Sequence, residues 1–340
     1  MNRIVAAPIK RSQIIPRGFP MKRIPALALL VAPLLACSGG GPKNPDGGGG
    51  GGPSSWLAGG GGQLAATTDG NSFVQRPSPT AKDLFSLVCV GHRLGWAGGA
   101  GGAIIATTDG GDTWRVQATP THATLRGLAF ANAFGGIAVG EGGTILRTDD
   151  GGATWQAVSS PVGSSLFAAA LSPDGNTAWA AGAGGVLLRS TDGARSFRQI
   201  VVPTTAGLRG LRFAGDGLRG FAVGENGVVL ATRDGGQTFL SLGSAPGALR
   251  SVAVSEDGER VIAVGEGGLA WRSDDAGATF SAQRLPAPGA LNAIGFSDDS
   301  PATGWAVGEQ GAVFVTTDNG KSWLGASSPL RGDLYSVEDL

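Results

Sequence analysis

The chain of 340 residues is long enough for one large domain or two ordinary ones. It carries 26 Lys and Arg residues against 26 Asp and Glu, so it has no excess positive charge with which to bind phosphate, and nucleic acid is excluded as an expected partner. Its 61 glycines show no Gly-X-Y period, which excludes collagen, and they separate short apolar runs, which indicates many tight turns between many short strands.

Residues 1–37 are predicted to be a leader with a lipoprotein signal peptide, with Met21 as the expected start. Two basic residues after Met21 precede an apolar stretch, residues 24–35, that is too short to cross a bilayer of ~30 Å as a helix and is typical of a signal-peptide core. It ends in Leu-Leu-Ala-Cys, which is similar to the lipobox of bacterial lipoproteins. That resemblance implies a lipid on Cys37 and a protein exported to the bacterial cell envelope and anchored to a membrane. An ordinary secretory signal with an incidental Cys37 is the alternative.

The next segment, residues 38–53, reads SGGGPKNPDGGGGGGP and cannot bury apolar surface, so a flexible tether is predicted there. Residues 54–340 are then expected to form the folded domain. If Cys37 is lipidated, Cys89 has no partner, and in the apolar run SLVCV it is expected to pack as a small hydrophobic residue. The few cysteines and histidines form no cluster, so no metal and no cofactor are expected.

One short motif recurs seven times in residues 54–340. One copy is TTDGGDTW at 107–114, and the first copy, TTDGNSF at 67–73, is one residue shorter. The aspartates of the motif lie 40–43 residues apart, at Asp69, Asp109, Asp150, Asp192, Asp234, Asp275 and Asp318. A leucine that opens a short apolar run recurs in step with them, at Leu84, Leu125, Leu166, Leu208, Leu249, Leu291 and Leu334. The 287 residues of this region therefore form seven units of 41.

Each unit predicts four short strands, because the leucine run, two runs around a glycine turn and a run after the motif follow one another. A four-stranded sheet has two faces to bury, and a radial array buries both against its neighbours. We therefore predict an all-β, seven-bladed β-propeller of four-stranded antiparallel blades. The first motif has no leucine run before it, and the last leucine run has no motif after it. The C-terminal strand from Leu334 is expected to join three strands from about residues 55–78 and close the ring.

The repeated motif falls between the third and fourth strands and is expected to be a turn. Its aspartate can accept hydrogen bonds from backbone N–H groups, and a glycine such as Gly111 tolerates a positive φ. The pattern Ser/Thr-x-Asp-x-Gly-x-Thr/Ser-Trp/Phe resembles the Asp-box, or BNR, repeat, although Ala194 replaces the glycine in one copy. The resemblance implies a structural turn away from the usual ligand face. We therefore expect the seven aspartates to be structural, with no catalytic or metal-binding role.

The residue after each marker leucine differs between blades and is expected to lie at the mouth of the central channel. Around the ring these residues are Phe85, Arg126, Phe167, Arg209, Arg250, Asn292 and Tyr335. Three arginines and three aromatic residues make this ring a candidate site for a peptide or an acidic ligand. The alternative is structural, because each blade with an arginine carries a glutamate in the facing turn. Three ion pairs of ~0–1 kcal/mol would then form within blades, namely Arg126–Glu141, Arg209–Glu225 and Arg250–Glu266.

Sialidases also carry Asp-boxes, and they use an arginine triad and a tyrosine nucleophile. Residues of those types are present in the ring, at Arg126, Arg209, Arg250 and Tyr335. Sialidases, however, resemble a six-bladed ring with irregular box spacing, and their Phe-Arg-Ile-Pro motif is absent from this sequence. Units of 40–43 residues also leave no long loop with which to build a pocket. We therefore expect no enzymatic activity.

Two blades, AVGEGGTILRTDDGGATW at 138–155 and AVGEQGAVFVTTDNGKSW at 306–323, resemble the photosystem II stability/assembly factor family of plants and cyanobacteria. The resemblance covers roughly residues 54–340 and implies a chaperone-like, seven-bladed propeller that binds membrane-protein segments through an arginine-rich face. The leader resembles a bacterial lipoprotein signal and not a plastid transit peptide, so the photosynthetic role is not expected to carry over.

We therefore predict a non-catalytic envelope lipoprotein with a monomeric propeller, which binds a protein or membrane-protein partner as an assembly factor or scaffold would. A carbohydrate or peptidoglycan ligand is the main alternative, and a glycosidase of the sialidase type is a further one.

Overall fold

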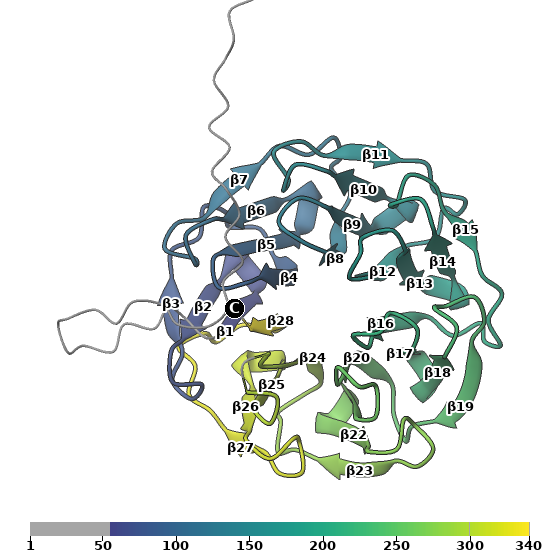
Figure 1. Ribbon diagram of the computed structural model, residues 1–340. Helices are drawn as coiled ribbons and strands as arrows, with labels where there is room; N and C mark the ends of the chain where they lie inside the picture. The colour runs from purple at the N-terminus through teal and green to yellow at the C-terminus, as the bar shows by residue number, and fades with distance from the viewer. Residues whose placement is uncertain (1–54, 299, 340) are drawn as a thin grey trace, which may run out of the picture. The chain divides into compact units, whose positions relative to one another are not determined.

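The computed structural model describes residues 55–298 and 300–339. These residues form 28 strands in seven four-stranded antiparallel sheets, arranged as blades around a central axis (Figure 1). The predicted leader, Cys37 and the tether lie outside the described residues and stay predictions. Within the described ranges, no helix has the length and apolar character needed to cross a membrane.

Six blades follow one another along the chain, each running from its innermost to its outermost strand. They are β4 (Leu84–Val90), β5 (Leu94–Gly99), β6 (Ile104–Thr107) and β7 (Arg115–Gln117); β8 (Leu125–Phe130), β9 (Gly136–Gly140), β10 (Ile145–Thr148) and β11 (Gln156–Val158); β12 (Leu166–Leu171), β13 (Ala178–Gly182), β14 (Leu187–Ser190) and β15 (Arg198–Gln199); β16 (Leu208–Phe213), β17 (Gly220–Gly224), β18 (Val228–Thr232) and β19 (Leu240–Ser244); β20 (Leu249–Val254), β21 (Val261–Gly265), β22 (Leu269–Ser273) and β23 (Ser281–Arg284); β24 (Leu291–Phe296), β25 (Gly304–Gly308), β26 (Val313–Thr316) and β27 (Leu324–Gly325).

The seventh blade combines the two ends of the described chain. Its strands, again from the inside outward, are β28 (Leu334–Asp339), β1 (Ser55–Gly59), β2 (Leu64–Thr67) and β3 (Val74–Arg76). In β28, Val337 pairs with Leu57, and the carboxylate of Asp339 accepts a hydrogen bond from Ser55 Oγ at 3.0 Å. The predicted seven-bladed ring, closed by the C-terminal strand, is thus confirmed. The closure leaves each innermost strand in contact with the innermost strands of two neighbouring blades (Figure 1).

The core lies between the blades, on both faces of each second strand. All five residues of β17 are buried, and its sequence GFAVG contains no polar side chain. Trp179 of β13, for example, packs with Leu230 and Phe239 of the next blade. A strand covered on both faces is expected to be continuously apolar, as these strands are. The outermost strands are mostly exposed, so the apolar content of a blade falls from its second strand outward.

Two kinds of turn mark the two faces of the ring. A single 3₁₀ turn joins the second strand to the third in every blade, and we call the face that carries these turns the rim face. The turns are η1 (Gly60–Gly62), η2 (Ala100–Gly102), η3 (Glu141–Gly143), η4 (Ala183–Gly185), η5 (Glu225–Gly227), η6 (Glu266–Gly268) and η7 (Glu309–Gly311). The repeated motif joins the third strand to the fourth, so it lies at the opposite end of every blade, on the box face.

Hydrogen bonds to one carboxylate organise each box. Asp109 accepts bonds from the Thr113 hydroxyl at 2.6 Å, the Thr113 N–H at 2.9 Å and the Thr107 hydroxyl at 2.7 Å. These bonds, led by that of the Thr113 hydroxyl, lower the pKa of Asp109 to about 2. Gly111 adopts a φ of +87°, and a Cβ there would lie 1.9 Å from the ring of Trp56 in the preceding blade. The box is therefore both a turn and a surface against which the neighbouring blade packs.

We expect Asp109→Ala to lower the melting temperature by about 2–4 °C, because it removes bonds to a backbone N–H and two hydroxyls that hold the turn. Thermal unfolding followed by circular dichroism measures the change. Asp112→Ala is the control, because the Asp112 side chain is exposed and, in the described part of the chain, makes no hydrogen bond. The lowered pKa means that the bonds stabilise the fold above about pH 4 and are lost as the pH falls toward 2. Equal melting temperatures for the two variants at pH 7 would contradict this role.

Candidate functional site

The structure brings the seven ring residues together. Each is the second residue of an innermost strand, and all of them line one cavity of about 340 Å³ in the central channel. We call this set the channel rim; it consists of Phe85, Arg126, Phe167, Arg209, Arg250, Asn292 and Tyr335. No group of three or more His, Cys, Asp or Glu side chains among the described residues is arranged to hold a metal ion.

Aromatic rings and guanidinium groups alternate along part of the rim. The rings of Tyr335 and Phe85 lie 4.9 Å apart, and the guanidinium of Arg126 stands 4.2 Å from the centre of the Phe85 ring. Arg209 stands 4.1 Å from the centre of the Phe167 ring. Each contact joins two neighbouring blades, so both guanidinium planes are held in place by the blade before their own.

Two of the three predicted ion pairs are confirmed. Arg126 Nη2 lies 2.8 Å from Glu141 Oε1, and Arg209 Nη2 lies 2.6 Å from Glu225 Oε1. Each glutamate begins the 3₁₀ turn of the same blade, and the arginine is the main cause of the lowered pKa of that glutamate. Both guanidinium groups are therefore fixed on two sides, by an aromatic ring and by a carboxylate.

The predicted pair Arg250–Glu266 is wrong. Arg250 Nη1 instead donates to Asn292 Oδ1 at 2.6 Å and to Glu309 Oε1 at 2.9 Å, both in the next blade. The preceding blade offers Arg209 and not an aromatic ring, and its Glu225 is already paired with Arg209. The next blade offers the amide oxygen of Asn292 and the carboxylate of Glu309, so the Arg250 side chain points toward that blade. Glu266 is exposed and forms no ion pair with any described residue.

The three arginines of the rim are therefore each balanced by a glutamate. Glu141, Glu225 and Glu309 offset the three arginines, and Glu266 adds a further negative charge on the same face. The arginine side chains remain 36%, 43% and 37% exposed, which leaves N–H groups free to contact a ligand. Such an arrangement can recognise a segment that offers planar hydrogen-bond acceptors and a flat apolar surface together.

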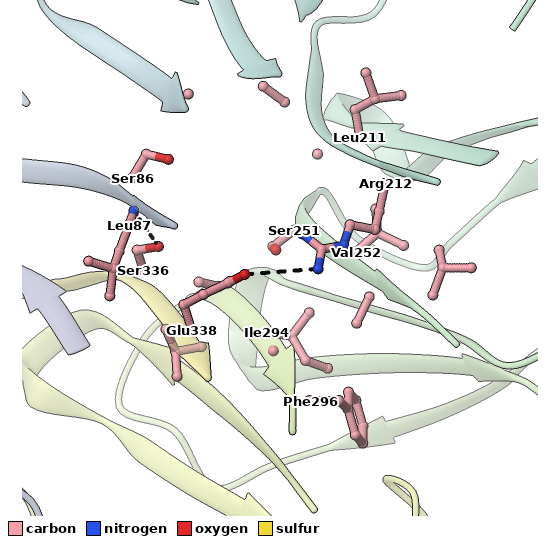
Figure 2. Close-up of a pocket in the computed structure, with 18 of the residues that line it drawn as sticks. Ser86, Leu87, Leu211, Arg212, Ser251, Val252, Ile294, Phe296, Ser336 and Glu338 are labelled. Atoms are coloured by element: carbon pink, nitrogen blue, oxygen red, sulfur yellow. Dashed lines mark hydrogen bonds and ion pairs between the residues drawn. The ribbon is translucent and has the colours of Figure 1, made fainter. Parts of the chain in front are cut away.

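A second charged pair lies deeper in the channel, and the sequence analysis did not find it. Arg212 of β16 and Glu338 of β28 approach each other across the channel, with Nη2 and Oε1 3.9 Å apart (Figure 2). Burial raises the pKa of Glu338 to about 7, and the charge of Arg212 partly opposes this rise. The sequence does distinguish these two residues, because both lie four positions after a marker leucine, where the other five blades have Val, Ala or Gly.

Serine hydroxyls complete the wall at this depth. Ser336 Oγ accepts a hydrogen bond from the Leu87 N–H at 3.0 Å (Figure 2). Ser86 Oγ accepts one from the Leu128 N–H, also at 3.0 Å. These bonds run from one innermost strand to the next. They satisfy backbone groups on the edge of each sheet that faces the channel.

The sequence matches the family described as photosynthesis system II assembly factor YCF48 over residues 106–206 and 194–332, which together exceed half of the chain. The chain belongs to this family. A search of curated proteins found no match.

Solved propellers are similar to this chain in fold. A structure described as YCF48 bound to D1 peptide has a TM-score of 0.59 and 20% identity, covering 73% of this chain and 82% of that one. YCF48 from Cyanidioschyzon merolae has a TM-score of 0.58 and 19% identity, covering 74% and 87%. The GH74 xyloglucanase from Xanthomonas campestris reaches a TM-score of 0.59 at 14% identity, covering 73% of this chain and 45% of its own. At these identities the likeness establishes the propeller fold.

The corrected ion pair can be tested with a double-mutant cycle. We expect Arg250→Ala and Glu309→Gln to couple by about 0.2–1 kcal/mol in urea unfolding, as half-exposed pairs do in solvent. The matched cycle with Glu266→Gln is expected to show no coupling, because Arg250 turns away from that turn. A larger coupling to Glu266 than to Glu309 would contradict the arrangement.

The channel pair predicts an unusual titration. We expect the Glu338 carboxyl to titrate near pH 7 in carbon-detected NMR, and Arg212→Met to raise that midpoint further, because the opposing charge is removed. The unfolded chain ionises this group near pH 4.3, so its contribution to the free energy of unfolding falls as the pH rises from about 4 to 7. Glu338→Gln is expected to remove this slope. A midpoint below pH 5 would contradict the burial of the carboxyl.

Proposed function

We propose that this protein is a non-catalytic, lipid-anchored envelope protein whose channel rim binds a segment of a partner protein, as an assembly factor or scaffold does. Membership of the assembly-factor family supports this proposal. A structure of a homologue is described as bound to a D1 peptide, which supports a protein segment as the class of ligand. The D1 peptide itself is a property of that homologue.

The three rim arginines carry the proposal. Their half-exposed guanidinium groups are held by Phe85, Phe167 and Asn292 and by glutamates, so they keep their positions without a ligand. A site that is fixed in advance loses little conformational entropy on binding, which favours recognition of a flexible segment. Peptide carbonyls and carboxylates are acceptors that match the free N–H groups of arginine.

The surroundings of the rim favour binding over catalysis. The 3₁₀ turns beside it are three residues long, so the rim face is low and open to an extended segment. Tyr335 lies against the Phe85 ring, and burial is the main cause of its raised pKa, which makes its phenol a poor nucleophile. A sialidase-type role for this tyrosine is therefore disfavoured.

A carbohydrate ligand has less support than a protein segment. Sugars in proteins commonly stack on aromatic faces, and the rim has three candidate rings. The Phe85 ring contacts both Arg126 and Tyr335, and Arg209 covers one face of Phe167. These contacts leave little aromatic surface free for a sugar ring.

The proposed anchor fits the same role. A lipid on Cys37 would tie the propeller to a membrane through the 16-residue segment 38–53. A Gly-rich tether of that length has a root-mean-square span of about 20–24 Å, so it would keep the propeller close to the membrane surface.

The proposal is tested with the full-length lipoprotein and detergent-solubilised membranes from the source cells. We expect the variant Arg126→Ala, Arg209→Ala, Arg250→Ala to recover its protein partner at least about ten-fold less well than the wild type, measured by quantitative mass spectrometry. The matched control replaces three exposed arginines on other parts of the blades, Arg93, Arg115 and Arg198, with alanine. Equal recovery by the rim variant and its control would overturn the rim as the site.

A further inference from the structure

At most junctions between blades, a side chain of one blade donates a hydrogen bond to the box of the next. The acceptor is the carbonyl oxygen of the residue that follows the box aspartate. The donor is an indole Nε1 from the second strand or a guanidinium Nε from the third. The bonds are Trp96 to Gly151 at 2.8 Å, Arg147 to Gly193 at 2.7 Å, Trp179 and Arg189 to Gly235 at 3.1 and 2.8 Å, Arg272 to Asn319 at 3.2 Å and Trp305 to Gly70 at 2.7 Å. At a sixth junction, the ring of Trp56 fills the space beside Gly111 without such a bond.

The junction between the β16–β19 blade and the β20–β23 blade has neither kind of donor. The second-strand position holds Phe221 and the third-strand position holds Ala231, which pair with each other across the sheet. Neither side chain can donate a hydrogen bond. No side chain in the described ranges donates to the carbonyl of Ala276, the residue that follows the aspartate in the facing box.

An apolar cavity of about 330 Å³ occupies this junction. Its walls include Phe221, Ala231, Leu240, Leu242 and Ala276. The ring of Trp271 stacks on Phe280 in the same apolar cluster, at 4.0 Å between centroids, but neither of these rings lines the cavity. The Phe221 ring and Leu242 contact the box glycine Gly277, where an indole packs at other junctions, and the cavity lies alongside these two smaller side chains.

The chain has no spare tryptophan to fill the cavity. All eight tryptophans lie in the strands and boxes of the propeller, and residues 1–54 contain none. A guanidinium fits less well, because Arg219 and Arg233 already line the cavity and Arg233 forms no ion pair among the described residues. The two arginines disfavour a further cation in the cavity. The apolar walls and the carbonyl of Ala276, which accepts no bond from a described side chain, favour a neutral aromatic group that carries one N–H donor.

The cavity opens beside an outer strand that is suited to a partner chain. β19 is the longest of the outermost strands, at five residues, and its sequence LSLGS carries no charge. Leu240 at its start is 71% exposed and lines the cavity. No strand of the described residues pairs with the outer edge of β19, so an extended segment can lie along it.

We propose that this cavity binds a tryptophan side chain presented by an extended segment of another protein. The indole packs against Phe221 and Leu242, and its Nε1 donates to the carbonyl of Ala276, as the indoles of Trp96 and Trp305 do at their own junctions. The cavity lies at the box end of the blades, so this site is separate from the channel rim and does not depend on the function proposed for the rim.

The probe for this site is N-acetyl-L-tryptophanamide, titrated into the full-length protein with ¹³C-labelled leucine methyl groups. We expect saturable shifts at Leu240 and Leu242. The 1-methyl derivative of the probe, which lacks the indole N–H, and N-acetyl-L-phenylalaninamide are expected to bind about five-fold more weakly, because the carbonyl of Ala276 then stays unpaired. Equal affinity for the 1-methyl derivative would overturn the hydrogen bond, and no shift at millimolar probe would overturn the site.

Variants separate this cavity from the rest of the surface. Phe221→Trp restores the indole of the other junctions, so it is expected to raise the melting temperature and abolish probe binding. If Phe221→Trp does not fold, Ala231→Arg is used to fill the cavity, because it introduces the arginine that the preceding blade has at the same third-strand position, Arg189. Leu240→Ser is expected to weaken binding several-fold, whereas Leu324→Ser, at the equivalent exposed position of another blade, is expected to leave it unchanged. Undiminished binding by both filled variants would overturn the proposal.

Discussion

The need to bury both faces of every blade governs this structure. The second strands carry apolar side chains on both faces, so a blade is stable only between two neighbours. An open row of blades would leave two such faces exposed to water. The pairing of β28 with β1 removes both, and it also fixes the number of blades at seven. The channel and its rim exist only because the ring closes.

This constraint divides the residues of each repeat into two classes. Side chains between blades must complement the next blade. At Gly111, for example, a Cβ would collide with the ring of Trp56 in the preceding blade, so only glycine fits there. Side chains that face the channel meet no such surface and can differ between blades. The chemistry that distinguishes one propeller from another is therefore concentrated along the axis, where Arg126, Arg212 and Glu338 lie.

The sequence predicted the features that depend on a single repeat or on the count of repeats. Four strands per blade, seven blades and the closing strand all follow from the spacing of the box aspartates and marker leucines, since every copy constrains the others. The pairs Arg126–Glu141 and Arg209–Glu225 lie within one blade, so they were predictable too. The partner of Arg250 was not, because it depends on which side chains the two neighbouring blades present at the same height.

Features missed by sequence reasoning depend on a difference between blades. Arg212 and Glu338 belong to blades that are not adjacent, and only the curvature of the ring brings them across the channel (Figure 2). The junction cavity likewise arises from the absence of a large donor at Phe221 and Ala231. Alignment of the repeats reveals both exceptions. Only the folded ring shows that the first places the Glu338 carboxyl in the channel and that the second places the Ala276 carbonyl beside a cavity.

Charge balance at the rim bears on how such a propeller selects a partner. A surface of free arginines would attract any acidic segment, with an affinity that salt screens readily. Here each guanidinium is already paired with a glutamate, so a bound segment has to compete with that carboxylate or use the N–H groups that remain. Net electrostatic attraction is therefore small, and discrimination rests on the geometry of the N–H groups that remain. A rim of this kind would suit transient engagement of one particular protein segment, as the function proposed above requires.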